Sequence, residues 1–405
     1  MIIHVHAKVS LYNFDMLQLI FCLLLTTSAY ADDTTAHSFE NFLSNIRTQA
    51  VDQGVSTATI NQAFKGLVPN PKVIKFDRTQ AEFSQNFWRY LDSRVSKYRL
   101  DKGTEKLAQH QQTFQKNYKK YGVPPHVIVA FWGLETNYGT NTGNLNLLRS
   151  LATLSFDQRR STFFTEQLLA LLKLIDAGKI PMNAEGSWAG AMGNVQFMPT
   201  NVAAYGIDAD DDGKIGLWDN EQDIFASAAN FLQKIGWHRG ERWGREVKIP
   251  KHFDHQLANL NTKKTVNEWQ ALGVRTADDK DLPTSDMRAS LMLPMGYSGP
   301  AFLAYRNFRA ILNWNRSILY ALSVGHLSDR LAGTPQLFAT PIKEPSLSRD
   351  DITHIQTMLN QLGFDTGEPD GISGPKTRNA TRDYQRANNL PIDGYVGYQL
   401  FQQLQ

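Results

Sequence analysis

One glutamate stands alone at the end of a long apolar stretch of the chain. In "GVPPHVIVAFWGLETNYG", residues 122–139, an apolar run leads to Glu135, and no other Asp or Glu lies between Glu105 and Asp157. A carboxyl group packed among apolar side chains loses hydration, which raises its pKa and keeps it protonated near neutral pH. General-acid cleavage of a glycosidic bond requires that protonated form. The alternative is a glutamate at a helix end that faces solvent or pairs with a lysine.

A second stretch combines small residues with aromatic and amide side chains. "GSWAGAMGNVQFMPT", residues 186–200, interleaves glycines with Trp188, Met192, Gln196 and Phe197. Glycine lets a backbone approach a ligand closely, aromatic rings stack on sugar faces, and an amide bonds hydroxyl or N-acetyl groups. The spacing fits neither G-x-G-x-x-G nor the P-loop, which argues against phosphate binding. A glycine-rich turn packed between helices is the alternative interpretation.

A third stretch, "DADDDGKIGLWD" at residues 208–219, is acidic. Its carboxylates fall at positions 1, 3, 5 and 12 of a loop: Asp208, Asp210, Asp212 and Asp219. With Gly213 at the sharp turn and the carbonyl of Lys214 next, this is the oxygen-ligand spacing of an EF-hand calcium loop. A short Asp replaces the usual bidentate Glu at the last position. We predict a structural Ca²⁺ site, and a solvated acidic turn capped by its own side chains is the alternative.

Other chemistries find little support in the sequence. His238, His252 and His255 lack an H-E-x-x-H frame, which argues against zinc catalysis. The G-x-S-x-G nucleophile elbow is absent, which disfavours a serine hydrolase. The formal net charge is +3 without a dense Lys/Arg stripe, which suits an acidic polymer such as the cell wall better than nucleic acid. No organic cofactor is predicted.

The elements that must position these residues are mainly helical. Apolar residues spaced by three and four predict helices from Ser38 to about Lys106 and again after residue 305. Pro124 and Pro125 predict the start of a buried helix that runs to about Tyr138. Short apolar runs broken by glycine and proline predict a small β element between residues 245 and 305. The fold class is therefore mainly α, of α+β type.

The N-terminus has the pattern of a secretory signal peptide. A short apolar run from Leu17 to Leu25 precedes an A-x-A cleavage pattern that ends at Ala31. The run is too short for a permanent membrane span, and no later segment is apolar enough for one. Cys22 lies inside the apolar run without the small residues that a lipoprotein signal needs. We predict export to the periplasm by a cleaved signal peptide, residues 1–31, without a lipid anchor.

Three motifs in order resemble the lytic murein transglycosylase B family of bacterial cell-wall enzymes. They are "FWGLETNYG", "GSWAGAMGNVQFMPT" and "LNWNRSILYALSVGHLSDRL", and the resemblance covers nearly all of residues 38–338. The tail resembles a peptidoglycan-binding domain of three short helices, through "IQTMLNQLGF", "PDGISGPKTRNATRDYQ" and "IDGYVG". The resemblance implies a lysozyme-like catalytic domain at residues 32–338, a linker at 339–347 and a wall-binding domain at 348–405.

The resemblance also implies roles for single residues, with Glu135 as the catalytic acid. The residues that it places in the sugar groove are Tyr90, Ser187, Met192, Gln196, Trp314, Asn315 and Tyr320. Trp314 stands where the family carries tyrosine, so stacking would be kept and a phenolic hydrogen bond lost. Phe231 likewise replaces a tyrosine. Core packing is the alternative for each groove residue. The acid that closes the calcium loop is Asp223 by this comparison.

A lone acid predicts an unusual reaction, because an ordinary glycosidase needs two carboxylates. The hydroxyl at C6 of N-acetylmuramic acid could attack C1 itself and form a 1,6-anhydro ring without water. The alternatives are a hydrolytic muramidase whose second carboxylate is Glu185 or Asp157, and a non-catalytic wall-binding protein. The predicted partner is the glycan strand of peptidoglycan, while proteins of cell-wall synthesis or division are partners that the sequence does not identify.

Overall fold

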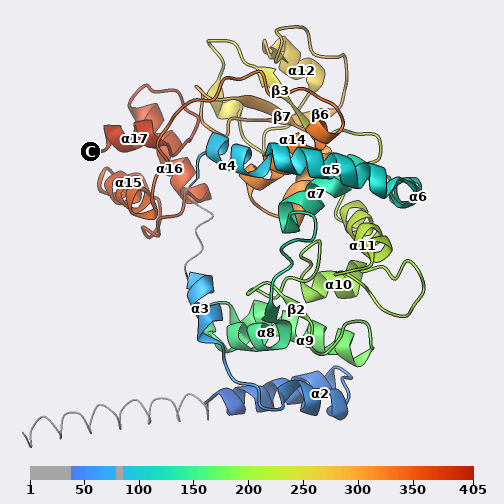
Figure 1. The fold of residues 1–405 in the computed structure, drawn as a ribbon. Helices are drawn as coiled ribbons and strands as arrows, with labels where there is room; N and C mark the ends of the chain where they lie inside the picture. Colours follow the sequence, from blue (N-terminus) through green and yellow to red (C-terminus); the bar gives the residue numbers. More distant parts are fainter. Residues whose placement is uncertain (1–37, 79–84) are drawn as a thin grey trace, which may run out of the picture.

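The computed structural model describes residues 38–78 and 85–405. The predicted signal peptide, residues 1–31, lies outside the described residues. Most of the described chain is helical (Figure 1), which confirms the predicted mainly α fold. Within these described ranges, no helix is both long and apolar enough to cross a membrane.

Helices dominate both ends of the described chain, and most strands lie between α11 and α13. After the helical residues 38–52, the helices are α2 (Thr57–Phe64), α3 (Pro71–Arg78), α4 (Phe87–Arg94), α5 (Lys97–Gln109), α6 (Gln111–Tyr121), α7 (Pro125–Thr136), α8 (Leu147–Phe156), η1 (Gln158–Arg160), α9 (Ser161–Asp176), α10 (Pro199–Tyr205), α11 (Glu221–Lys234), η2 (His255–Leu257), α12 (Val266–Ala271), α13 (Arg306–Trp314), α14 (Ile318–Leu331), α15 (Arg349–Gln361), α16 (Pro375–Ala387) and α17 (Tyr398–Gln403). The strands are β1 (Leu145–Asn146), β2 (Glu185–Gly186), β3 (Gly244–Lys248), β4 (Lys264–Thr265), β5 (Arg275–Thr276), β6 (Arg288–Met292) and β7 (Ala301–Ala304).

The helix α7 is buried, as its apolar sequence predicts. It begins at Pro125, where the proline ring fits the first helical turn, and most of its side chains are buried. The helices α14 and α5 pack against it. It ends at Thr136 rather than near Tyr138, because Asn137 and Tyr138 adopt left-handed backbone angles, with φ of 52° and 62°.

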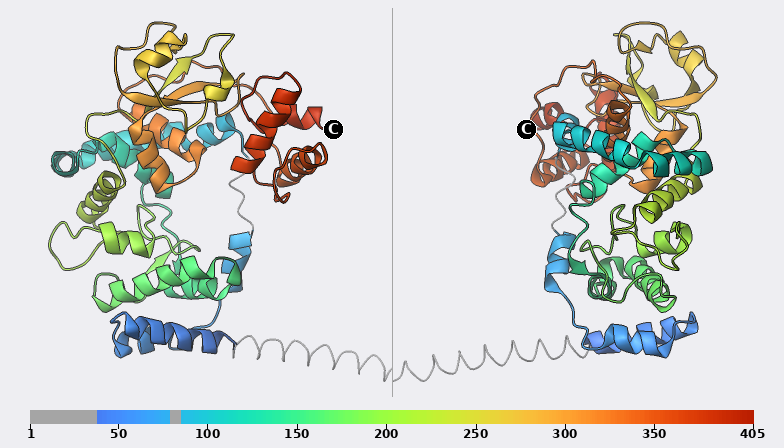
Figure 2. Two further views of the ribbon diagram at one scale, coloured as in Figure 1. Left: turned by 180° about the vertical axis from the view of Figure 1, so that it is seen from behind. Right: turned by 45° about the vertical axis from the view of Figure 1, so that its right-hand side comes forward.

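Two groups of helices lie on either side of the chain segment that follows α7. The helices α2, α8 and α9 pack together at one end of the molecule, while α4, α5 and α14 lie with the sheet at the other (Figures 1 and 2). The helix α10 packs on both α9 and α11 and lies between the two groups. One large hydrophobic core includes residues of both groups. The chain crosses between the groups directly after Glu135.

Five strands form an antiparallel sheet between α11 and α13. Their order is β4-β6-β7-β3-β5, and Leu291 pairs with Leu303 at its centre. The sheet has its own hydrophobic cluster around Trp269 of α12, whose indole N–H donates to the carbonyl of Ala289 at 3.0 Å. The predicted β element between residues 245 and 305 is confirmed.

The last three helices, α15 to α17, form a compact unit with a separate hydrophobic cluster that includes Ile355, Leu359 and Leu400. The two D-G-x-x-G turns precede α16 and α17, and Gly371 and Gly394 in them have φ of 73° and 70°. Glycine adopts such angles without steric strain. The prediction that each turn leads the chain into the next helix is confirmed.

This C-terminal unit is docked on the rest of the molecule. The carboxylate of Glu246 on β3 accepts the N–H groups of Phe338 and Ala339, each at 2.7 Å. The N–H of Tyr297, after β6, donates to the carboxylate of Asp393 in the C-terminal unit at 2.8 Å. Hydrogen bonds therefore connect both the start of the joining segment and the C-terminal unit to the part of the molecule that carries the sheet.

Two titratable side chains lie on α14, three residues apart. Burial lowers the pKa of His326 to about 4 and raises the pKa of Asp329 to about 6. Because the unfolded chain binds a proton at His326 that the folded protein does not, stability falls as the pH drops from 6.5 to about 4. Asp329 acts in the opposite sense, since the folded protein binds its proton first as the pH falls through about 6. The two effects offset each other.

Asp329→Asn is expected to reveal the effect of His326 on the pH dependence of stability, because it removes the opposing effect of Asp329. Its free energy of unfolding should fall by about 2–3 kcal/mol more than that of the wild type between pH 6.5 and pH 4, at about 1.4 kcal/mol per pKa unit. His326→Gln should show the opposite, a relative gain as the pH falls. Urea titrations across this pH range measure both, and parallel profiles for all three proteins would contradict the assignment.

Candidate active site

A tight turn after α7 fixes where Glu135 lies. Glu135 is the penultimate residue of the helix and is half-buried. Asn137, Tyr138 and Gly139 follow with φ of 52°, 62° and 85°. Left-handed angles at two successive non-glycine residues are strained, and such strain is concentrated at functional sites. The buried helix therefore ends one residue after Glu135, its only carboxyl group.

Two side chains from other helices donate hydrogen bonds to Glu135. The indole Nε1–H of Trp314, at the end of α13, donates to Oε1 of Glu135 at 2.8 Å. The hydroxyl of Tyr320 on α14 donates to the same oxygen. Donors of this kind stabilise a carboxylate and hold its orientation. Three residues predicted for the site are therefore in direct contact.

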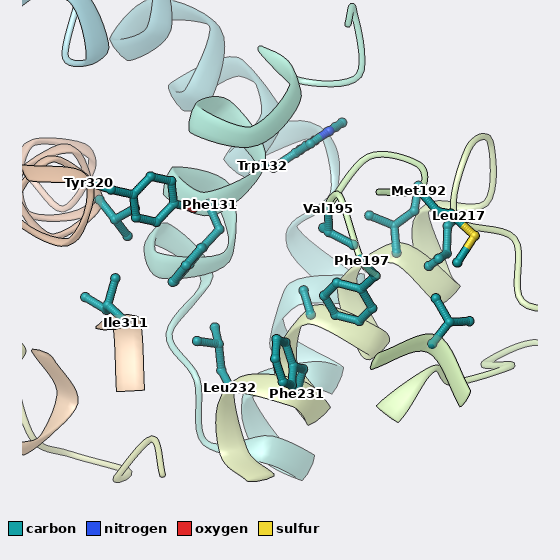
Figure 3. Close-up of a cluster of buried hydrophobic side chains, with 14 of the residues drawn as sticks. Phe131, Trp132, Met192, Val195, Phe197, Leu217, Phe231, Leu232, Ile311 and Tyr320 are labelled. Atoms are coloured by element: carbon teal, nitrogen blue, oxygen red, sulfur yellow. The ribbon is translucent and has the colours of Figure 1, made fainter. Parts of the chain in front are cut away.

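The replacement of the family's tyrosine by Trp314 was expected to cost a phenolic hydrogen bond. In the structure, Trp314 supplies a hydrogen bond of its own. Its indole N–H provides the donor, and its ring packs against Phe131, Phe197 and Phe231 at centroid distances of 4.3, 5.3 and 5.1 Å. Figure 3 shows Phe131 close to Tyr320, with Phe197 and Phe231 together opposite them. Phe231 is buried, so its ring packs against Trp314 without any need for a hydroxyl group.

The glycine-rich stretch forms a compact loop between β2 and α10. Met192 pairs with Gly186 and with Phe197 in isolated bridges. Gly193 has φ of 63°, and a Cβ at this residue would lie 2.4 Å from the carbonyl oxygen of Leu217, so only glycine fits. Met192 is completely buried. The structure therefore places Met192 in the core, beneath the surface that a sugar could contact.

Ser187 and Gln196 brace this loop with their polar atoms. The Oγ of Ser187 accepts the N–H of Ala191 at 2.9 Å. Gln196 has a left-handed φ of 49°, and its Nε2 donates to the carbonyls of Gly193 and Thr142 at 2.9 and 3.1 Å. Because Thr142 follows the turn after α7, Gln196 ties the loop to that turn.

The two remaining groove residues of the prediction lie near α14. Asn315 separates α13 from α14, and its Oδ1 accepts the N–H of Ser317 at 3.0 Å. It therefore shapes the turn between Trp314 and the helix that follows. Tyr90 lies on α4, which packs against α14. Its ring is buried and the guanidinium of Arg94 lies 4.9 Å from its centroid.

The two carboxylates considered as second catalytic groups have other surroundings. Asp157 accepts the N–H of Arg159 at 3.1 Å at the start of η1 and forms an ion pair with Arg78 at 3.2 Å. Glu185 is exposed on β2. The geometry does not favour either as a partner of Glu135.

The acidic loop before α11 gathers a set of oxygen ligands. Asp208, Asp210 and Asp212 have carboxylate oxygens within 4.8 Å of one another. Gly213 follows with φ of 91°, and the N–H of Lys214 donates to Asp212 at 2.8 Å. Hard oxygen donors in a turn of this kind fit Ca²⁺.

The side chain of Asp223 holds the loop closed by accepting hydrogen bonds from the main chain of the loop. Its carboxylate is fully buried and accepts the N–H groups of Ala209 and Gly216, each at 2.7 Å. Burial raises the pKa of Asp223, and the nearby carboxylates of the loop raise it further. The two hydrogen bonds lower it but do not cancel the effect of burial. Asp219 is exposed, and among the described residues neither Asp219 nor Asp223 belongs to the carboxylate cluster.

Two buried polar residues of the site were not predicted. Thr136, adjacent to Glu135, donates to the carbonyl of Asn194 at 2.8 Å. The side chain of Asn194 in turn accepts the indole N–H of Trp132. The sequence did carry a signal for each. Thr136 is a polar residue at the end of a mostly apolar helix, and Asn194 is an amide within the glycine-rich stretch.

This helical fold, with one carboxyl group at the end of a buried helix, is the lysozyme-like fold of the lytic transglycosylases. The chain matches the family described as the transglycosylase SLT domain over residues 38–329. It matches a peptidoglycan binding domain over residues 348–404. The chain therefore belongs to the transglycosylase SLT domain family.

Named relatives agree with this assignment. Membrane-bound lytic murein transglycosylase B of Escherichia coli (strain K12) is 31% identical over 251 residues, 60% of this chain and 67% of that protein. The crystal structure of SltB3 from Pseudomonas aeruginosa in complex with NAG-anhNAM-pentapeptide is 42% identical, with a TM-score of 0.87 over 90% of this chain and 99% of that one. Escherichia coli Slt35 in complex with calcium is 28% identical, with a TM-score of 0.63 over 72% and 92%. The predicted family resemblance is confirmed.

Proposed function

We propose that this lytic transglycosylase cleaves peptidoglycan with Glu135 acting first as general acid and then as general base. The observation that carries the proposal is the pair of donors, Trp314 and Tyr320, on one oxygen of a half-buried carboxyl group. Such donors stabilise the negative charge that develops when Glu135 gives up its proton. The anhydro sugar bound by the 42% identical SltB3 supports a reaction that forms this ring.

The reaction starts with a proton transfer from Glu135 to the oxygen that joins C1 of N-acetylmuramic acid to N-acetylglucosamine. The C1–O bond breaks, and the N-acetyl group of the same sugar stabilises the cation at C1. The new carboxylate then takes the proton of the C6 hydroxyl, whose oxygen bonds to C1 and closes the 1,6-anhydro ring. No water is consumed. The nucleophile belongs to the same sugar, which gives the rate advantage of proximity.

The polar residues predicted for the groove hold the sugars in place in this proposal. Ser187, Gln196 and Asn315 are assigned to the hydroxyl and N-acetyl groups, and the face of Trp314 to a sugar ring. Both carbonyl contacts of Gln196 use its amide nitrogen. No described residue donates a hydrogen bond to its Oε1, which leaves that oxygen as the acceptor for a sugar. Tyr90 contributes to the wall of the groove from α4.

A hydrolytic muramidase is the second candidate, because lysozyme-like folds also support hydrolysis. It needs a second carboxylate that activates a water molecule. Asp157 is bound to Arg78 and η1, and Glu185 is exposed on a strand. Their positions favour the route in which the substrate supplies its own nucleophile.

Digestion of purified sacculi by the full chain tests the activity itself. We expect soluble muropeptides to accumulate in proportion to time and to enzyme concentration. Binding to sacculi without the release of fragments would reduce the protein to a wall-binding module and overturn the proposal.

Residues 1–31 are proposed to be a cleaved signal peptide that directs the protein to the periplasm, where its substrate lies. Residues 32–338 then form the catalytic domain and 339–347 the linker. Residues 348–405 bind the wall, a role supported by the match to a peptidoglycan binding domain. Docking of this domain on the catalytic part keeps the groove near the bound wall.

We assign Ca²⁺ to the acidic loop, with Asp208, Asp210 and Asp212 as its carboxylate ligands and the carbonyl of Lys214 as a fourth. The ion neutralises the clustered charge and stiffens the loop. The Slt35 structure that contains calcium supports this assignment. Asp219 is a further candidate ligand, whereas Asp223 keeps the loop closed.

Removal of Ca²⁺ is expected to lower the melting temperature by about 3–6 °C, since an ion at a hundred times its Kd stabilises by about 2.7 kcal/mol. Asp210→Asn should abolish the difference between calcium and chelator. Asp211→Asn is the matched control, because it makes the same charge change in the same loop outside the carboxylate cluster. Equal melting temperatures of the wild type in calcium and in chelator would favour the solvated acidic turn.

A further inference from the structure

We propose that Asn194 is a positioning residue that ties the catalytic end of α7 to the C-terminal end of the acidic loop. The proposal rests on the assignment of Glu135 as the catalytic acid. Asn194 lies in the glycine-rich loop and is only 4% exposed. A side chain so deeply buried acts on the reaction through its neighbours rather than by touching the sugar.

One side of the connection is α7. The Oδ1 of Asn194 accepts the indole N–H of Trp132 at 2.6 Å, and its main-chain carbonyl accepts the hydroxyl of Thr136 at 2.8 Å. Trp132 precedes Glu135 by three residues and Thr136 follows it directly. The hydroxyl of Thr136 also accepts the N–H of Gly139 at 3.0 Å. Asn194 therefore contacts the last turn of α7 on both sides of Glu135.

The other side is the C-terminal end of the acidic loop. The Nδ2 of Asn194 donates to the carbonyls of Leu217 and Trp218 at 3.1 and 2.7 Å. Its main-chain N–H donates to the carbonyl of Leu217 at 2.8 Å. Gly216, one residue earlier, is held by Asp223. The amide uses its oxygen and its nitrogen at once, so one side chain joins two segments that are otherwise separate in sequence.

Loss of this connection should reduce turnover more than substrate binding. Asn194→Ala removes the side-chain hydrogen bonds to Trp132 and to the acidic loop, whereas the main-chain contact with Thr136 remains. The last turn of α7 then loses its support on the Trp132 side, so the carboxyl group of Glu135 shifts against the sugar. We expect kcat to fall about ten- to hundredfold, because displacements of about 1 Å cost up to that much. KM should stay within about threefold, since no groove residue is altered.

A double-mutant cycle tests whether Asn194 affects kcat through its hydrogen bond with Trp132. Trp132→Phe keeps an aromatic ring but removes the N–H that Asn194 accepts, and it should lower kcat in the same direction. Because both changes break one network, the double variant should be no more than about twofold worse than the poorer single variant. Trp132→Phe also carries the test if Asn194→Ala does not fold.

Asn307→Ala is the matched control. Asn307 is fully buried, accepts the N–H of His238 at 2.6 Å, and donates to the carbonyls of His238 and Glu241 at 2.9 and 2.7 Å. Its loss should lower the melting temperature as much as Asn194→Ala does, yet leave kcat of the folded enzyme within about twofold.

The variants are assayed as full chains on purified, uncross-linked peptidoglycan strands, with kcat, KM and melting temperature measured for each. The proposal is overturned if folded Asn194→Ala keeps kcat within about twofold of the wild type, or if the two single effects multiply in the double variant. A failure of the proposed function gives a different result, because Glu135→Gln would then remain active whatever the Asn194 variants show.

Discussion

Glu135→Gln is expected to lower the rate of muropeptide release by about a thousandfold or more. One residue serves as acid and as base, and general acid–base catalysis is worth roughly 10²–10⁴. Glutamine has nearly the same shape, and its amide oxygen can still accept hydrogen bonds from Trp314 and Tyr320. The variant should therefore fold and bind sacculi as the wild type does, so that only the release of soluble fragments is lost.

Glu185→Gln is the matched control for this substitution, because it makes the same chemical change at an exposed strand residue. It should keep at least about half of the wild-type rate, as expected for a surface position. A result in which Glu185→Gln or Asp157→Asn abolished cleavage would favour the hydrolytic muramidase. Cleavage by Glu135→Gln at the wild-type rate would show that the acid has been assigned wrongly.

Tyr320→Phe and Trp314→Phe are each expected to lower kcat about ten- to hundredfold. Each removes one donor to Oε1 of Glu135 while the other remains, and removal of one donor from an oxyanion hole typically costs about 10²–10³. The loss should lie at or below the lower end of that range, because Glu135 is only half-buried. The donors favour the carboxylate, so their removal favours the protonated acid. The high-pH side of the pH–rate profile should therefore move to higher pH in both variants.

Tyr205→Phe is the control for this pair, because the ring of Tyr205 stacks on Phe231 at 4.8 Å in the same aromatic cluster. It should leave both kcat and the pH profile unchanged. If Tyr320→Phe behaved like Tyr205→Phe, the hydrogen bond to Glu135 would be without consequence for catalysis, and the stabilising role of the two donors would be wrong.

The sequence was most informative where one segment determines its own structure. Pro124 and Pro125 predict the start of α7, and the unbroken apolar run predicts its burial. The D-G-x-x-G turns predict their own positive φ at Gly371 and Gly394, and the broken apolar runs predict the small sheet. In each case the cause is local, since proline, glycine and hydrophobic periodicity act within a few residues.

Contacts between distant segments were harder to predict. Trp314 and Tyr320 lie 179 and 185 residues from Glu135 in sequence, so nothing in the local pattern shows that both donate to one oxygen. The burial of Met192 depends on the bridges that fold the glycine-rich loop over it. The helix α7 ends about two residues before the predicted position, because Asn137 and Tyr138 adopt left-handed backbone angles. The hydroxyl of Tyr138 donates to the carbonyl of Arg99 on α5, a contact that no local pattern predicts.

The chemical nature of the cleaved ends tests the central claim most directly. Sacculi are digested by the wild-type chain in oxygen-18-labelled water, and the masses of the soluble muropeptides are measured. If the C6 hydroxyl is the nucleophile, the muramic acid ends are lighter by one water than hydrated ends and carry no heavy oxygen. Hydrated reducing ends that carry one heavy oxygen each would contradict the mechanism and show that water attacks C1.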